Sequence, residues 1–170
     1  MGYRAENLFR LFKAAAPTLL GVLGVLLLAA PIRLFEGFAP TPILPLVIVF
    51  FWSIYGPDYL PPLSVFVIGL LQDLLTGGPL GLWPAVYLVT QYIVMSQRAY
   101  FIGREQKVVW IGFAFASAGA GLILWLVMSL MSGALLPVRF LLLQLAATIA
   151  IYPLFGVVFG ELHRRVLVEA

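Results

Sequence analysis

The sequence predicts an all-α integral membrane protein with six transmembrane helices and both termini in the cytoplasm. Composition is the first reason: 63% of the 170 residues are hydrophobic, only 10% are charged, and the mean hydropathy is +1.08. A single soluble core of this size cannot bury so much apolar surface, so part of that surface must face lipid. The other two reasons are the six apolar runs and the uneven distribution of basic residues between them.

Composition also limits the class of protein. No hydrophilic stretch is long enough to fold as a soluble domain, so we expect residues 1–170 to form a single transmembrane domain. Cysteine is absent, which excludes disulfides, thiolate metal sites and a cysteine nucleophile. The net charge of +3 does not indicate a nucleic-acid partner, because the basic residues fall between apolar runs and not in one patch. We expect membrane lipid as the surroundings.

The apolar runs predict the helices. A bilayer core of about 30 Å requires roughly 20 apolar residues per helix. Four runs approach or exceed this length, whereas 41–55 and 60–76 are short enough to be re-entrant segments instead. Proline and glycine residues separate the runs, as is typical of helix ends. The predicted helices cover residues 14–33, 41–55, 60–76, 80–97, 108–131 and 137–162.

The first run follows a basic start, which is also typical of a cleaved secretory signal. The run is long for a signal, and Leu28 occupies a position where a cleavage site at Ala30 would need a small residue. We therefore expect an uncleaved first helix.

Charge asymmetry favours six helices over five. With six crossings, eight basic residues lie on one side of the membrane: Arg4, Arg10, Lys13, Arg98, Arg104, Lys107, Arg164 and Arg165. The other side holds Arg33 and Arg139. If 41–55 failed to cross, the division would become four against six. Because Lys and Arg concentrate in cytoplasmic loops, the first arrangement, with both ends in the cytoplasm, is favoured.

Two stripes of small residues predict faces where helices approach closely, since membrane helices associate through backbone contact and interhelical hydrogen bonds. The stripes are Gly112, Ala116 and Ala120 in the fifth run, and Gly156 and Gly160 in the sixth. We expect both to pack within the chain's own bundle, with dimerisation as the alternative. Pro153 should kink the sixth helix, because it cannot donate to the carbonyl of Ile149.

Apart from Glu161 at the very end of the last run, one acid lies within the apolar runs, in the stretch GLLQDLLTGGPLG at residues 69–81. The six-helix topology places Gln72 and Asp73 one turn below the outer end of the third helix. A charge at this depth is moderately costly, and a partner or water relieves the cost. The candidate ion-pair partners are Arg33 and Arg139, the two bases on that side. Proton or cation coupling, substrate contact and docking of another membrane protein are the alternatives.

The same stretch is expected to fix how the third and fourth helices join on the outer side, through Asp73 and the turn that follows it. The residues predicted to form this structural or partner-docking motif are Gln72, Asp73, Gly77, Gly78, Pro79 and Gly81.

No pattern in the sequence predicts catalysis. It contains no phosphate-binding glycine loop, no paired-carboxylate site and no metal-ligand cluster. We expect no enzymatic activity, no catalytic residue, no metal and no cofactor. Four further polar side chains within the runs are Tyr87, Gln91, Gln144 and Thr148. We expect these to tie helices together, with the lining of a small-molecule cavity as the alternative.

Residues 66–94, FVIGLLQDLLTGGPLGLWPAVYLVTQYIV, resemble the signature region of the rod shape-determining MreD family. That region reads Gly-Leu-Leu-x-Asp-Leu-x-x-Gly-x-Pro-Leu-Gly. The matching positions are Gly69, Leu70, Leu71, Asp73, Leu74, Gly77 or Gly78, Pro79, Leu80 and Gly81. Length, six predicted spans and a short basic tail are also similar to this family.

The resemblance implies a multi-pass protein of the bacterial inner membrane, similar in fold to the substrate-binding S components of energy-coupling-factor transporters. It implies a non-enzymatic scaffold subunit of the cell-elongation complex, which supports lateral peptidoglycan synthesis. The implied partners are the bitopic protein MreC, the RodA glycosyltransferase, a class B penicillin-binding protein and the MreB filament. The likeness in fold makes an S component of a vitamin transporter the alternative function.

Overall fold

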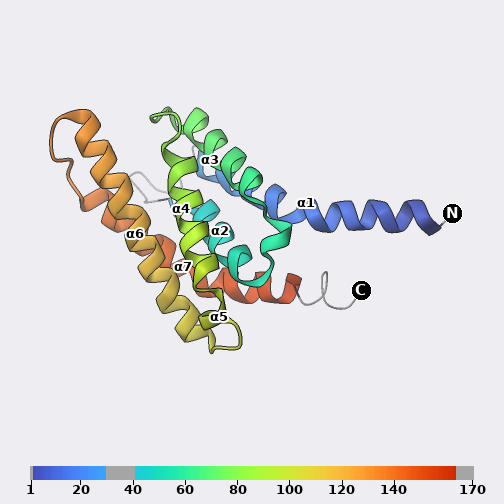
Figure 1. Cartoon of the computed structure of the whole chain (residues 1–170). Coiled ribbons are helices and arrows are strands. Elements are labelled where there is room, and N and C mark those ends of the chain that lie inside the picture. The colour runs from blue at the N-terminus through green and yellow to red at the C-terminus, as the bar shows by residue number, and fades with distance from the viewer. Residues whose placement is uncertain (1, 30–40, 164–170) are drawn as a thin grey trace.

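The computed structural model describes residues 2–29 and 41–163, with side chains described for 15–29 and 41–158. The all-α prediction is confirmed for these residues, which form helices and short turns without a strand (Figure 1). The helices are α1 (Gly2–Ala29), α2 (Leu44–Tyr55), the 3-10 helix η1 (Pro57–Tyr59), α3 (Pro62–Thr76), α4 (Leu82–Ser96), α5 (Arg98–Phe101), α6 (Gln106–Ser132) and α7 (Arg139–His163).

The six long helices correspond in order to the six predicted runs. Differences lie at the ends: α1 begins at Gly2, well before residue 14, and positions 30–33 lie outside the described residues. The first part of α1 extends away from the other helices (Figure 1). The short helices η1 and α5 occupy connections that the sequence predicted as a turn and a loop.

In the described part of the chain, two helices are long and apolar enough to cross a membrane, by length and composition alone. They are Gln106–Ser132 and Arg139–Val158. The shorter apolar helices are Ala15–Ala29, Leu44–Tyr55, Pro62–Thr76 and Leu82–Ser96. The 12 residues of α2 rise about 18 Å, well short of a bilayer core of about 30 Å. Six crossings therefore stay a prediction.

Helix α2 lies at the centre of the bundle. All residues from 45 to 54 are buried, and the helix contacts α1, α4, α6 and α7. A helix that is apolar on every side is stable where other helices surround it. This explains how a run with no polar face forms the core.

Aromatic side chains join α2 to the helices around it. Phe50 makes edge-on contacts with Phe101, Phe113 and Tyr152, with ring centroids 6.0, 5.1 and 5.6 Å away. Phe113 of α6 also stacks on Tyr152 of α7, with centroids 4.3 Å apart. Such geometries add to the contribution of apolar burial.

Side chains of other helices form hydrogen bonds with backbone groups at both ends of α2. Before its first turn, the Ile43 N–H donates a hydrogen bond to the Thr148 hydroxyl of α7 (2.9 Å). At its end, the Arg98 guanidinium donates to the Ile54 carbonyl (2.7 Å), where the helix dipole also favours a positive charge. These bonds matter because a backbone group left unpaired away from water costs several kcal/mol.

Within α7, a proline leaves one backbone carbonyl without its usual N–H donor, and a side chain of α6 supplies the missing hydrogen bond. Pro153 has no N–H for the carbonyl of Ile149, four residues earlier. The Trp110 indole N–H of α6 donates to that carbonyl instead (2.8 Å). The bond therefore both satisfies the backbone and ties α6 to α7.

Replacing Trp110 by Phe should lower the stability of the protein by about 0.6 to 1.7 kcal/mol, the range for an interhelical side-chain bond. In a Pro153→Ala background the loss should be smaller, because the substituted alanine supplies its own N–H to the Ile149 carbonyl. The measurement is the thermal unfolding midpoint of detergent-purified protein. An equal loss in both backgrounds would contradict this account.

Candidate functional site

Asp73 lies in the last turn of α3, and its side chain is only 1% exposed. One carboxylate oxygen accepts a hydrogen bond from the Gly81 N–H (2.6 Å), and the other accepts one from the Trp83 N–H (3.2 Å). Both donors lie at the start of α4, where N–H groups have no intrahelical acceptor and the helix dipole favours negative charge. Asp73 therefore caps the helix that follows its own.

The remaining N–H groups at the start of α4 are also paired. The Leu82 N–H donates to the Pro79 carbonyl (3.2 Å). Pro84 has no N–H, and the Ala85 N–H donates to the Gly81 carbonyl (3.1 Å), which begins the helical ladder. Together with the two bonds to the carboxylate, this arrangement leaves no donor in the first turn of α4 without an acceptor.

Three glycines shape the junction. Gly69, one turn before Asp73, lies against the start of α4, and a methyl group added there would come within 2.6 Å of the Pro84 Cα atom. Gly77 and Gly81 have φ angles of +68° and +94°. Residues other than glycine rarely adopt this conformation, so these two positions allow α3 to end and α4 to begin within a short turn.

Gln72 makes a second connection between the two helices. Its side-chain oxygen accepts a hydrogen bond from the Tyr87 hydroxyl of α4 (2.5 Å), and both side chains are fully buried. These hydrogen bonds join α3 to α4. A methyl group added at Gly78 would make only an ordinary contact with the Thr76 hydroxyl (3.8 Å), so the structure does not require glycine there.

The Gln72 side chain also borders a cavity of about 410 Å³, which we name the α3–α7 cavity. Its lining residues include Gln72, Thr76, Trp83, Leu124 and Gln144. The Gln72 Nε2 atom has no hydrogen-bond acceptor in the described part of the chain. The cavity therefore adjoins a buried donor that has no partner.

In the described residues, the partners of the Asp73 carboxylate are backbone N–H groups. Arg139 is exposed at the start of α7, and within the described residues it forms no ion pair with Asp73. Arg33, the other candidate, lies outside the described residues. Two N–H groups at the start of α4 converge on the carboxylate from the next turn of the chain.

The prediction that polar side chains tie helices together is confirmed. In addition to the Tyr87 bond, Gln91 of α4 donates to the Leu60 carbonyl before α3 (2.8 Å). Gln144 of α7 donates to the Thr41 carbonyl before α2 (3.0 Å). Each bond joins a helix to a backbone group near the end of another.

The small residues of α6 and α7 contact several different elements. A methyl group added at Gly112 would lie 2.6 Å from the Cζ atom of Phe101, in α5. One added at Gly156 would lie 3.0 Å from the side-chain amide of Gln106. Both contacts lie within the chain. Gly160 is outside the residues whose side chains are described.

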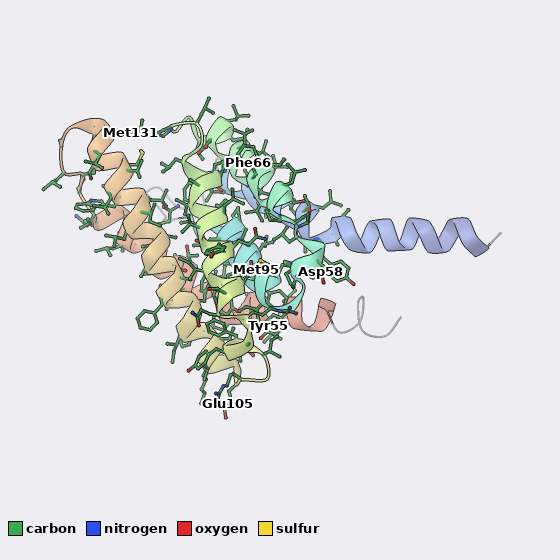
Figure 2. The ribbon with its side chains drawn as sticks, viewed as in Figure 1. Tyr55, Asp58, Phe66, Met95, Glu105 and Met131 are labelled. Carbon is green, nitrogen blue, oxygen red and sulfur yellow. The ribbon has the colours of Figure 1, made fainter. Side chains whose placement is uncertain are left out.

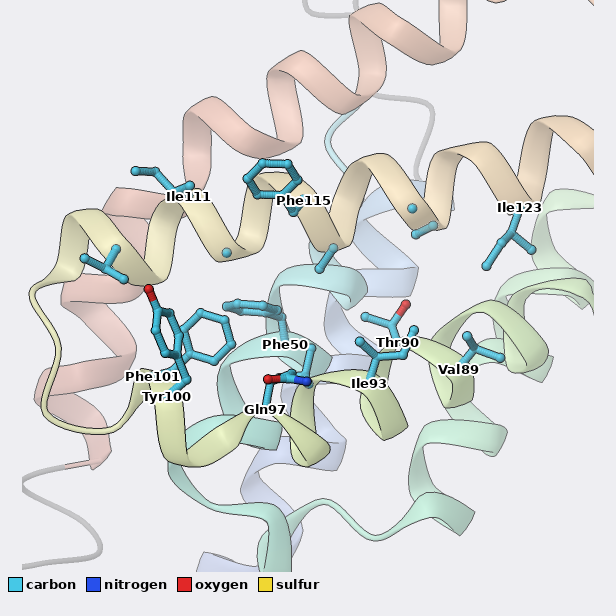
Figure 3. Close-up of a pocket in the computed structure, with 16 residues that line it drawn as sticks. Phe50, Val89, Thr90, Ile93, Gln97, Tyr100, Phe101, Ile111, Phe115 and Ile123 are labelled. Carbon is cyan, nitrogen blue, oxygen red and sulfur yellow. The ribbon is translucent and has the colours of Figure 1, made fainter.

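The α6 stripe also lines an open groove between α4 and α6, of about 550 Å³, which we name the α4–α6 groove (Figure 3). Phe50 of α2 lies between the two helices. Besides Phe50, the groove is defined by Val89, Thr90, Ile93 and Val94 of α4, Gln97 directly after α4, Tyr100 and Phe101 of α5, and Val108, Ile111, Gly112, Phe115, Ala116, Gly119, Ala120 and Ile123 of α6.

Within the described residues, no group of three or more His, Asp or Glu side chains is placed to hold a metal ion. Comparisons of the chain with protein-family models, with curated proteins and with solved structures find no match.

Sequence reasoning located the junction but missed its chemistry. The available signal was an acid one turn before a glycine-rich turn, since such an acid lies near the first N–H groups of the next helix. The closeness of Gly69 to α4 and the α4–α6 groove have no signal in the linear pattern, because both depend on the angle between helices.

Asp73→Asn should destabilise the protein less than Asp73→Leu, because an amide oxygen still accepts one of the two hydrogen bonds. Leucine removes the acceptor of both N–H groups, which are part-buried, so the cost per group should stay below the cost of about 1–3 kcal/mol for a fully buried unpaired group. Arg139→Gln should leave the thermal unfolding midpoint unchanged and should add independently to Asp73→Asn. If the double variant is more stable than the sum of the two single-variant effects predicts, the ion-pair hypothesis is supported again.

Proposed function

We propose that this chain is a non-enzymatic scaffold subunit of the bacterial cell-elongation complex, as its resemblance to the MreD family implies. The proposal rests on one observation: the polar side chains of the MreD-like stretch form hydrogen bonds that join two helices. Both oxygens of Asp73 accept hydrogen bonds from α4 amides, and Gln72 bonds to Tyr87. A carboxylate held in this way is poorly suited to proton transfer or ion coupling, and well suited to keeping two helices in a fixed arrangement.

The surface of the chain supports a location in the membrane. Large apolar side chains are exposed on most of the long helices, including Leu63 of α3 (73% exposed), Phe115 of α6 (77%) and Leu154 of α7 (64%). Monomeric soluble proteins rarely expose apolar patches of more than a few hundred Å². Lipid, or the helices of other membrane proteins, would cover these faces.

The proposed topology has six crossings of the inner membrane and cytoplasmic termini. The eight-to-two distribution of basic residues supports it. The turn between α3 and α4 and the loop between α6 and α7 lie toward one end of the bundle, and α5 lies at the other (Figure 1). Because its neighbours shield α2 from lipid, this short helix does not itself need to match the bilayer thickness.

Cysteines introduced at position 78 and at position 105 should label differently, and the chain has no other cysteine. Gly78 and Glu105 lie in turns at opposite ends of the bundle, and Glu105 is exposed (Figures 1 and 2). In intact cells a membrane-impermeant maleimide should label position 78 and should reach position 105 only after lysis. The reverse pattern would overturn the proposed orientation.

The proposed partners are an MreC-like bitopic protein, the MreB filament, and a RodA-type glycosyltransferase with a class B penicillin-binding protein, held directly or through the MreC-like protein. Affinity purification of the tagged chain from its native membrane should recover the MreC-like and RodA-like proteins. Recovery of an energy-coupling module with a bound small molecule would overturn the scaffold proposal.

A substrate-binding S component is the second candidate function, and the α3–α7 cavity favours it. Its volume of about 410 Å³ falls within the range of about 300–1,000 Å³ typical of ligand pockets. Gln72 belongs to the cavity lining, and its Nε2 atom is a buried donor without an acceptor in the described part of the chain. If this function is correct, Gln72→Leu would remove the small molecule recovered in the purification.

A further inference from the structure

The α4–α6 groove is apolar along most of its length. The Thr90 hydroxyl, which belongs to its wall, already donates to the Val86 carbonyl (2.8 Å). Among the described residues, no charged side chain lines the groove. In contact with a membrane, such a surface is suited to a hydrocarbon chain.

One end of the groove is polar and basic. Gln97 and Tyr100 belong to its lining there, and the Arg104 guanidinium lies 5.3 Å from the centroid of the Tyr100 ring. Lys107 is exposed at the start of α6, directly before Val108, which also lines the groove. The nearest acid in sequence is Glu105, and Figure 2 shows it at this end of the molecule. In the connection from α5 to the start of α6, Arg104 and Lys107 outnumber Glu105, so this described segment carries a net positive charge.

We propose that the α4–α6 groove binds one anionic phospholipid, with an acyl chain along the groove and the phosphate near Arg104 and Lys107. Both parts of the lipid find a suitable surface: the apolar lining would contact the acyl chain, and the basic side chains would attract the phosphate. The inference rests on the membrane location in the proposed function, which places this end at the cytoplasmic surface.

The size of the groove favours an acyl chain over a partner helix. A transmembrane helix about 10 Å wide and about 30 Å long occupies roughly 2,400 Å³, whereas the groove holds about 550 Å³. A helix would lie across its opening with most of its volume outside.

The structure provides a variant that fills the groove and a matched control. A methyl group added at Gly119 would meet no atom within 4 Å, so Gly119→Leu extends into the groove without a clash at the Cβ atom. It also replaces a helical glycine by a better helix former. Ala118, one residue earlier, is exposed and is not part of the groove. Ala118→Leu adds apolar bulk on the same helix and leaves the groove empty.

The test is native mass spectrometry of delipidated, detergent-purified protein with phosphatidylglycerol or phosphatidylcholine of the same acyl chains. Wild type and Ala118→Leu should each retain one phosphatidylglycerol in preference to phosphatidylcholine, and Gly119→Leu should lose it. Lys107→Gln should weaken phosphatidylglycerol binding about fivefold, which corresponds to about 1 kcal/mol per basic residue near a lipid phosphate. Arg139→Gln, which removes the same charge outside the groove, should have no effect.

Equal retention of the two lipids, or full retention by Gly119→Leu, would overturn the proposal. In native membranes, a photoreactive phenylalanine analogue at position 115 should crosslink to lipid, and a protein adduct would show that a partner occupies the groove instead. The lipid measurement uses purified protein alone. Its failure is therefore distinguishable from a failure to recover the proposed protein partners.

Discussion

The need to pair backbone N–H and C=O groups away from water determines how these helices are held together. At three interruptions of the helical ladder, another helix provides the missing partner: Asp73 at the start of α4, Arg98 at the end of α2, and Trp110 at the gap left by Pro153. Each bond also sets the position of one helix relative to another. Where water is excluded, an unpaired group costs several kcal/mol, so these contacts position helices that apolar packing alone would hold less specifically.

Asp73 shows why an acid inside an apolar helix need not mark a reaction. Buried ionisable groups in membranes are functional candidates by default, but this carboxylate faces two backbone donors and the positive end of a helix dipole. Asparagine would place only one acceptor oxygen where two donors converge. The contact of Gly69 with α4 brings the two helices close enough for both bonds. The polar groups of the motif are therefore used for contacts within the chain.

The buried position of α2 also explains the α4–α6 groove. Phe50 of α2 lies between α4 and α6, and Phe101 of α5 packs against Gly112 of α6. The two aromatic rings therefore separate the helices, while the small residues of α6 leave the space between them open. A stripe that would allow close helix contact elsewhere becomes the wall of a groove because α5 inserts beside it.

The sequence by itself determined the helical class, the order of the long helices and the importance of residues 69–81, because apolar runs, glycine, proline and one isolated acid are local features. It also indicated that polar side chains such as Gln91 and Gln144 would tie helices together. The tertiary structure decided which groups they meet: the Gly81 and Trp83 amides for Asp73, the Ile149 carbonyl for Trp110, and an open groove beside Ala116. Those outcomes depend on the angles and distances between helices, which arise when many side chains pack at once and which no single stretch of sequence encodes.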